Sequence, residues 1–376
     1  MQRLTENLFD SMIKVTIFLS DYSKIRRSTM KKFDIVICGA GPAGAAFAMT
    51  APKDMKILLL DGTVNPKPCG GLLAPDAQKA LASFELTLPK EILVDPQIFS
   101  VRTIDMKTGL VRRYQRMYIN VDRDKFDKWM VSQSGGNVEI AKARLTSCSK
   151  SGDGFVSVCK SENGDEFTVT SKYIVGSDGA NSIVRRTFFP KLKTRQYVAI
   201  QQWFDIDENT PDPFYSCIFD PETSACCSWS IYKDNYVIFG GAYEPEHCRE
   251  RFEKQKEKMK DFGLELKKPV KTEGCLVLRP SSPASFCTGK DGIFLIGEAA
   301  GFISPSSLEG ISSAINSAVA LSDSFKEGGN IHGRYSKKVI ALRMKLLAKN
   351  LKCPFMYNPT LRKLVMKSGI TALKLK

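Results

Sequence analysis

Asp34-Ile35-Val36-Ile37-Cys38-Gly39-Ala40-Gly41-Pro42-Ala43-Gly44 is the stretch that decides the fold of this 376-residue chain. A short apolar strand ends in a glycine-rich turn, and the small residues beyond the turn predict a helix. Gly39 permits the tight turn, Gly41 lets the backbone approach a pyrophosphate, and Gly44 allows close packing of helix on strand. The free N–H groups near Pro42 and Ala43, at the helix N-terminus, favour an anion.

A second apolar strand, residues 57–60, ends at Asp61, twenty residues beyond Gly41. At this distance an acid accepts hydrogen bonds from the ribose of a dinucleotide. The glycine turn, its flanking strand and helix, and the acid together form a complete dinucleotide-binding fingerprint. By itself the fingerprint does not choose between NAD and FAD.

Composition narrows the class of protein. Hydrophobic residues make up 43 % of the chain, no apolar run reaches the ~18 residues of a membrane span, and the length allows two domains. Eleven cysteines without a Cys-x-x-Cys spacing fit a reducing, cytoplasmic setting. With only two histidines, we expect no metal site and no Ser-His or Cys-His catalysis.

The two ends of the chain differ from its middle. Residues 1–29 lack the pattern of a secretory signal, and we expect them to be a disordered extension ahead of a start at Met30. Residues 332–376 hold twelve Lys and Arg and no Asp or Glu, within a total net charge of +15.

The basic tail has three interpretations, because its lysines alternate with leucines in a helical pattern. It can be an amphipathic surface that meets anionic lipid, on the inner face of the membrane. It can also be a helix that packs on the domain with solvated lysines. Binding to nucleic acid lacks any recognition motif, so we expect no nucleic-acid partner.

Two further glycine-containing strand ends follow the first, at residues 176–179 and 297–301. Three segments distant in sequence would then converge on one extended ligand. FAD fits better than NAD, because it needs contacts along adenosine, pyrophosphate, ribityl chain and isoalloxazine.

These three segments resemble the motifs of the flavoprotein superfamily with the p-hydroxybenzoate hydroxylase fold. Within it, Lys67-Pro68-Cys69-Gly70-Gly71 and Ser228-Trp229-Ser230-Ile231-Tyr232-Lys233 resemble the geranylgeranyl reductase family. The resemblance covers residues 31–369. It implies an α/β fold with a Rossmann-like FAD-binding domain, an antiparallel β-sheet substrate domain and a basic helical C-terminus.

The resemblance and the pattern of elements also divide the chain. We expect the FAD-binding domain to be discontinuous, the substrate domain to interrupt it, and a helical segment to close the chain. The ranges are 30–95, 120–190 and 285–330 for the FAD-binding domain, 96–119 and 191–284 for the antiparallel-sheet domain, and 331–376 for the basic C-terminal segment. Strands are expected at 97–121 in a hairpin and at 137–148, 154–160, 166–170, 197–206, 214–219, 225–232 and 236–241.

By the same resemblance, particular residues would hold the cofactor. Arg123 lies on a helix whose arginine contacts FAD, the backbone of Leu145 faces adenine, and Asp178 and Gly179 lie beside the nucleotide. Glu298 stands where the family has Asp, and its carboxylate would bond the ribityl hydroxyls. The remaining cofactor contacts expected are Gly70, Gly71, Gly297, Gly310 and Ile311, the last two at a helix N-terminus that points at the flavin N1/O2 edge.

Cys69, Trp229 and Tyr232 are the expected residues on the substrate side. Cys69 can be a catalytic residue at the flavin face or a small buried thiol in a glycine turn. Trp229 and Tyr232 lie at positions of a motif of the family's substrate cavity; Trp229 matches it, whereas Cys227, Ile231 and Tyr232 replace three of its residues. Leu308 likewise replaces a glycine that the family usually has.

The leading functional hypothesis is an FAD-dependent oxidoreductase that reduces C=C bonds of a polyprenyl or related hydrophobic lipid. Its electron donor would be NAD(P)H or a reduced carrier protein. A flavin monooxygenase that uses NAD(P)H and O2 is the alternative, since fold alone does not settle function. A third possibility is a non-catalytic flavin-binding redox sensor.

Overall fold

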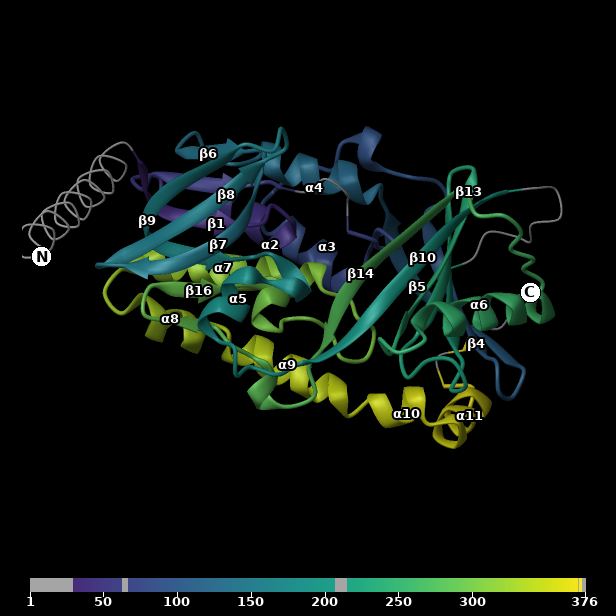
Figure 1. Ribbon diagram of the computed structural model, residues 1–376. Helices are drawn as coiled ribbons and strands as arrows, with labels where there is room; N and C mark the ends of the chain where they lie inside the picture. The colour runs from purple at the N-terminus through teal and green to yellow at the C-terminus, as the bar shows by residue number, and fades with distance from the viewer. Residues whose placement is uncertain (1–29, 63–66, 207–214, 371, 374–376) are drawn as a thin grey trace, which may run out of the picture.

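The computed structural model describes residues 30–62, 67–206, 215–370 and 372–373, so the expected extension over residues 1–29 lies outside the described residues. The chain forms two lobes, each built on an eight-stranded sheet (Figure 1). The strands of the first sheet are β1 (Lys31–Cys38), β2 (Ile57–Leu60), β6 (Val138–Ala141), β7 (Ala143–Ser151), β8 (Gly154–Ser161), β9 (Glu166–Gly176), β15 (Gly289–Lys290) and β16 (Ile293–Leu295). Those of the second sheet are β3 (Leu72–Leu73), β4 (Ile98–Asp105), β5 (Leu110–Asn120), β10 (Arg195–Asp205), β11 (Tyr215–Phe219), β12 (Ser228–Lys233), β13 (Tyr236–Tyr243) and β14 (Lys271–Arg279).

Helices cover both sheets and form the C-terminal segment. They are α2 (Pro42–Thr50), α3 (Pro75–Ala82), α4 (Arg123–Ser132), α5 (Ile183–Phe188), α6 (Cys248–Lys258), α7 (Ile311–Glu327), α8 (Ile331–Lys338), α9 (Ile340–Asn350), α10 (Cys353–Tyr357) and α11 (Pro359–Lys367). Short 3-10 turns are η1 (Lys90–Ile92), η2 (Gly179–Asn181), η3 (Met259–Phe262), η4 (Pro283–Ser285) and η5 (Gly297–Ala300).

The first sheet has a parallel centre in the order β16-β9-β1-β2-β6. Residues 35–38 of β1, all of β2 and β16, and residues 174–176 of β9 are apolar and buried, because both faces of the sheet are covered there. Helices α2, α4 and α7 pack together on the sheet, and the alanine-rich face of α2 is buried, which permits this close approach. The strand ends are in register, with Leu295, Gly176, Cys38 and Leu60 forming one row across the sheet.

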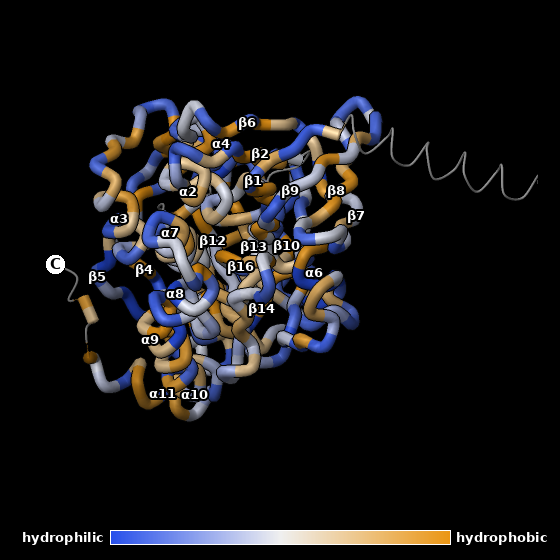
Figure 2. Tube along the Cα trace, turned by 90° about the vertical axis from the view of Figure 1, so that its left-hand side faces the viewer, coloured by the Kyte–Doolittle hydropathy of each residue, from blue (hydrophilic) through white to orange (hydrophobic). Residues whose placement is uncertain are grey.

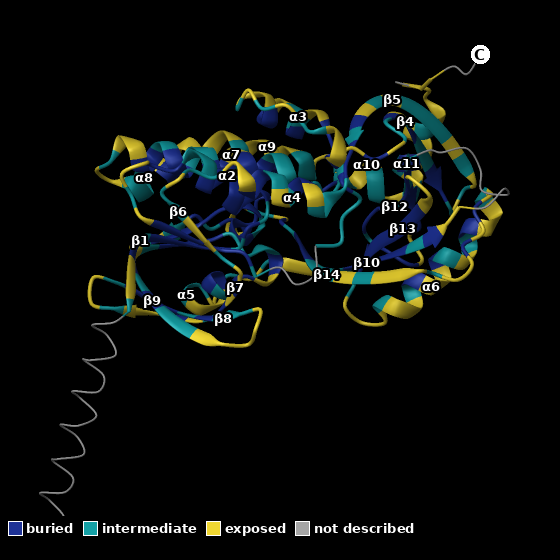
Figure 3. Ribbon diagram, turned by 90° about the horizontal axis from the view of Figure 1, so that it is seen from above, coloured by how far each residue is buried: buried dark blue, intermediate teal, exposed yellow. Residues whose placement is uncertain are grey.

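The second sheet runs in the order β14-β10-β13-β12-β11-β4-β5-β3. It is antiparallel as predicted except for one pair, since β4 and β11 run parallel. Helix α6 covers one of its faces (Figure 3). Strand β3 belongs to this sheet, although it falls in the range 30–95 expected for the FAD-binding domain.

Three strand predictions need correction. The strand expected at 137–148 is two strands, since β6 pairs with β2 and β7 pairs with β8. The strand expected at 225–232 begins only at Ser228, so Cys226 and Cys227 lie in the preceding loop rather than on a strand. Strand β14 was not predicted, because Gly274 and a polar first half obscure its alternation. It nevertheless spans the region between the two lobes, as Figure 3 shows.

The C-terminal segment is helical, as predicted. Helices α8 to α11 run along the lower edge of both lobes in Figure 1, and Figure 2 shows hydrophobic stretches on α9 to α11. A buried ion pair fixes α11 to the second sheet, with Arg362 Nη2 2.8 Å from Asp105 Oδ1. Within the described ranges, no helix combines the length and apolar character needed to cross a bilayer.

Candidate FAD site and substrate face

The three glycine turns lie side by side at the carboxyl ends of β16, β9 and β1. This is where ligands bind in open α/β sheets. The Ser177 hydroxyl donates to the carbonyl oxygens of Cys38 (2.9 Å) and Gly39 (2.7 Å), and so ties the second turn to the first. A side chain at Gly297 would lie 2.8 Å from Ala43 Cβ, which places the third turn against α2.

The glycines of the first turn serve different purposes. Gly39 has φ +106°, a conformation that favours glycine, and a Cβ at Gly44 would lie 1.9 Å from the Gly39 carbonyl oxygen. Gly41 has an ordinary φ of −67°, and a Cβ added there would meet nothing within 4 Å. The N-terminus of α2, starting at Pro42, has no side-chain cap. The space at Gly41 and the uncapped N–H groups together fit a pyrophosphate.

Asp61 follows β2 beside the loop between β6 and β7. It is almost buried and forms an ion pair with Lys142. Gly62 lies so close to Arg144 that a Cβ there would be 2.6 Å from its Cα. Leu145 is buried one residue further along β7. The structure thus brings Asp61 and Leu145 to the same end of the site.

Asp178 offers an observation that fits a bound ligand. Its Oδ2 accepts a hydrogen bond from the Ile183 amide at 2.7 Å, whereas its buried Oδ1 has no partner within the described residues. Burial raises the pKa of this carboxyl. Gly179, next to it, has φ +70°. The unpaired oxygen, the open Gly41 and the uncapped helix fit FAD.

Arg185, which the sequence analysis did not single out, ties the second and third turns together. Its guanidinium donates to the carbonyl oxygens of Ala180 and of Ala299, the latter at 3.3 Å. The side chain is almost fully buried, and burial lowers its pKa.

Glu298 uses both carboxylate oxygens in the structure. Oε1 accepts from the Leu278 amide of β14 at 2.9 Å, and Oε2 pairs with Lys67. Burial opposes the charge on Lys67, but Glu298 prevails and raises the pKa of this lysine. Because a carboxylate oxygen can accept more than one hydrogen bond, a ribityl hydroxyl can share Oε2.

The N-terminus of α7 completes the expected cofactor contacts. Gly310 is its N-cap residue and Ile311 its first residue, and no side chain caps this 17-residue helix. Leu308, two residues earlier, has φ +56°, the left-handed conformation that the family's glycine adopts freely. Glu309 accepts a hydrogen bond from the Tyr118 hydroxyl at 3.1 Å, which joins this segment to β5.

The loop Cys69-Gly70-Gly71 lies where the two lobes meet. The Gly71 amide donates to Cys69 Sγ at 3.4 Å, and a Cβ at Gly70 would lie 2.3 Å from Ile231 Cδ1 of β12. Arg123 bonds Asp127 at 2.9 Å and also contacts the Cys69 thiol. Burial opposes the charge on Arg123, but Asp127 and Cys69 together raise its pKa.

Lys233 is a buried lysine behind this loop that the sequence analysis missed. Only 4 % of it is exposed, and its ammonium donates to Asn120 Oδ1 (2.5 Å), to the Val121 carbonyl (2.6 Å) and to the Gly71 carbonyl (3.5 Å). Burial lowers the pKa of Lys233 to about 7, against the opposing effect of nearby Cys69 and acidic groups. Strand alternation could have predicted that Lys233 lies on the same face of β12 as Trp229, because the two residues are four apart.

The structure separates the two aromatic residues predicted for the substrate side. Trp229 donates to Gln201 Oε1 at 3.1 Å and packs in a cluster with Leu308 and Cys275, next to the third turn. Tyr232 is buried in the other cluster, which includes Phe252 of α6. Residues three apart on a strand face opposite sides, so Tyr232 is not brought together with Trp229.

Comparisons with known proteins agree with this geometry. An FAD binding domain family model matches residues 103–328. Protein CbrA of Escherichia coli K12 is 47 % identical over 348 residues, covering 91 % of this chain and 98 % of that protein. Protein CbrA of Shigella dysenteriae is 48 % identical with the same coverage.

Solved structures show the same fold at low sequence identity. A geranylgeranyl bacteriochlorophyll reductase-like protein from Thermoplasma acidophilum has a TM-score of 0.73 at 18 % identity, covering 89 % of this chain and 91 % of its own. A Klebsiella pneumoniae HpxO variant with bound FAD has a TM-score of 0.63 at 14 % identity, covering 89 % and 94 %. The p-nitrophenol 4-monooxygenase PnpA of Pseudomonas putida has a TM-score of 0.63 at 14 % identity, covering 91 % and 99 %.

The FAD cofactor predicted from the three turns is therefore confirmed, and so is the p-hydroxybenzoate hydroxylase fold. The chain belongs to the FAD-dependent oxidoreductases with this fold and, within them, to the family of the CbrA proteins.

Proposed function

We propose that this flavoprotein reduces C=C bonds of a polyprenyl or related lipid. The observation that carries the proposal is the character of the second sheet where it faces the glycine turns. Trp229 and Ile231 of β12 and Cys275 of β14 carry indole, aliphatic and thiol groups there, and Leu308, from the segment before α7, packs with Trp229 and Cys275. Such a wall suits an apolar chain better than a charged substrate.

The bound cofactor would carry the redox chemistry. When bound by the three glycine turns, Glu298 and the N-terminus of α7, reduced FAD would supply a hydride for one carbon of the double bond, with NAD(P)H or a reduced carrier protein as the source of its electrons. A proton would be needed at the other carbon. The protein's own task is to exclude water and to place a proton donor.

Cys69 is the proposed proton donor. Its thiol contacts the Arg123 guanidinium and accepts a hydrogen bond from the Gly71 amide, so the thiol is held in place in this loop. Lys233 then acts as a positioning residue, since it holds the Gly71 carbonyl at the end of the same loop.

A flavin monooxygenase is the second candidate, because PnpA, a p-nitrophenol 4-monooxygenase, shares the fold. The two reactions differ in their products. A reductase adds two hydrogen atoms to the lipid without O2, whereas a hydroxylase adds one oxygen atom and consumes O2.

The test is mass spectrometry of lipids from cells with and without the protein, followed by turnover of the identified lipid under anaerobic conditions. Saturation of one double bond without O2 supports the reductase. A product that gains oxygen, or turnover that requires O2, contradicts it.

A matched pair of variants connects the site to the reaction. Trp229→Ala should retain FAD and slow re-oxidation of the reduced flavin by the lipid. Trp203→Ala is the control, because that indole bonds Glu273 at 2.8 Å and packs on Tyr236 toward the other end of β10. Equal re-oxidation rates in the two variants would show that Trp229 does not contact the substrate.

A further inference from the structure

The outer face of α9 and α10 is apolar. Ile340, Met344, Leu351 and Phe355 have exposed fractions of 54, 60, 74 and 52 %. They recur at helical spacing, and the two turn residues between the helices, Leu351 and Lys352, keep right-handed helical backbone angles. At about 1.5 Å rise per residue, the row is roughly 22 Å long. The apolar stripe of a surface helix normally faces the core, so this exposed row is a second apolar face of the helix.

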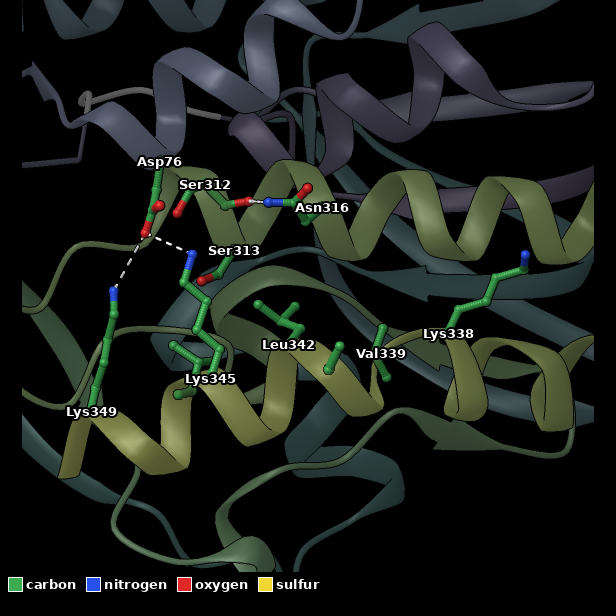
Figure 4. Close-up of a pocket in the computed structure, with 11 residues that line it drawn as sticks. Asp76, Ser312, Ser313, Asn316, Lys338, Val339, Leu342, Lys345 and Lys349 are labelled. Atoms are coloured by element: carbon green, nitrogen blue, oxygen red, sulfur yellow. Dashed lines mark hydrogen bonds and ion pairs between the residues drawn. The ribbon is translucent and has the colours of Figure 1, made fainter. Parts of the chain in front are cut away.

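The inner face of the same helix is already in use, so α9 is not a loose helix waiting to turn over. Leu346 is buried against the first lobe, and Lys345 Nζ lies 2.9 Å from Asp76 Oδ2 on α3. Figure 4 shows how Lys345 and Lys349 reach the same carboxylate across a pocket of about 320 Å³. The apolar outer row is therefore presented to the outside by a fixed element.

The charge around the row is complementary to an anionic surface. Lys337, one turn before the row, and Lys352, between Leu351 and Phe355, are both exposed. Acidic groups near the helix are already paired, Asp76 with Lys345 and Glu327 with Lys338 at 2.8 Å. The sequence from 332 to 376 adds no acid. Apolar side chains between exposed lysines are typical of helices that lie in the plane of a membrane interface.

We propose that the outer face of α9 and α10 docks the protein on an anionic lipid bilayer, with the four apolar side chains inserted and the lysines at the headgroups. This goes beyond the proposed reaction, and docking is measured without substrate, so the two can fail separately.

The test is co-flotation of the FAD-bound protein with vesicles of phosphatidylcholine alone or with about one third phosphatidylglycerol. We expect binding to the anionic vesicles that weakens at high salt. The combined variant Met344→Gln, Leu351→Gln, Phe355→Gln should bind at least ~10-fold more weakly. Val270→Gln is the matched control, since Val270 is 53 % exposed on the second lobe. FAD content and circular dichroism verify that each variant is folded.

Three results would overturn the proposal. The first is wild-type protein that does not float with anionic vesicles. The second is a triple variant that is folded and binds as well as the control. The third is a wild-type dimer in analytical ultracentrifugation that the triple variant abolishes, because the face would then belong to a second copy of the chain.

Discussion

Replacing Lys233 by methionine should change how the stability of the protein depends on pH. Lysine and methionine are similar in length, so the substitution removes the titrating amino group with little change in packing. It also leaves the oxygens of Asn120 and Val121 without their donor, which costs about 1–3 kcal/mol each. That cost is independent of pH, whereas the cost of burying the lysine is not.

The magnitude follows from the pKa of Lys233, which falls from 10.5 to about 7 on burial. Above pH 10.5 the lysine is neutral in the folded and unfolded states and the burial costs nothing. Between the two values only the unfolded chain binds the proton. The free energy of unfolding of the wild type therefore decreases by up to ~1.4 kcal/mol for each unit by which the pH is lowered. Below pH 7 the full penalty, roughly 5 kcal/mol, is present and constant.

The assay is urea unfolding of the wild type and Lys233→Met at a fixed excess of FAD, from about pH 7 to about pH 9.5. Relative to the wild type, the variant should lose roughly 3 kcal/mol of stability as the pH rises over this range. Lys79→Met, at an exposed lysine on α3, is the control and should track the wild type. A stability difference for Lys233→Met that stays constant with pH would refute the reasoning.

Other substitutions test the cofactor site and the ion pair between Arg362 and Asp105 that fixes α11 to the second sheet. Gly41→Val should fold normally and lose FAD affinity by at least ~100-fold in a fluorescence titration, because nothing but the ligand occupies that space. Gly44→Ala should instead fail to fold, as judged by circular dichroism, because its Cβ would overlap the Gly39 carbonyl. Glu298→Asp should weaken FAD binding about tenfold, since the shorter side chain cannot keep the Leu278 amide and also reach a ribityl hydroxyl. Arg362→Met should lower the free energy of unfolding by about 3–5 kcal/mol by leaving Asp105 buried and unpaired, and adding Asp105→Asn should restore part of the loss.

The cofactor end of the site could be predicted from the sequence because its information is local. The turn at Gly39 and the acid at Asp61 each depend on backbone geometry within a few residues. Their convergence then follows from a rule of parallel sheets, which places all carboxyl ends on one edge. The row formed by Leu295, Gly176 and Cys38 is the physical form of that rule.

Contacts between residues far apart in the sequence could not be predicted in the same way. The Lys67–Glu298 pair joins residues 231 positions apart, and Lys233 reaches Asn120 across 113 positions. The local sequence pattern around each residue contains no information about which residue, more than a hundred positions away, it will contact. Tyr232 is a different case, because strand alternation alone places it on the opposite face of β12 from Trp229, as the structure shows.

The structure explains what the extra methylene of Glu298, relative to the aspartate of the family, does. It lets one oxygen reach the Leu278 amide on β14 while the other lies beside Lys67. Strand β14 continues into the sheet that carries Trp229, and Lys67 leads into the Cys69 loop. A hydroxyl bound at Glu298 would therefore share the carboxylate with the Leu278 amide and Lys67, the two groups that connect it to β14 and to the Cys69 loop. Cofactor binding and the position of β14 and the Cys69 loop are then coupled through a single carboxylate. An aspartate, one methylene shorter, could not contact the Leu278 amide and Lys67 at once.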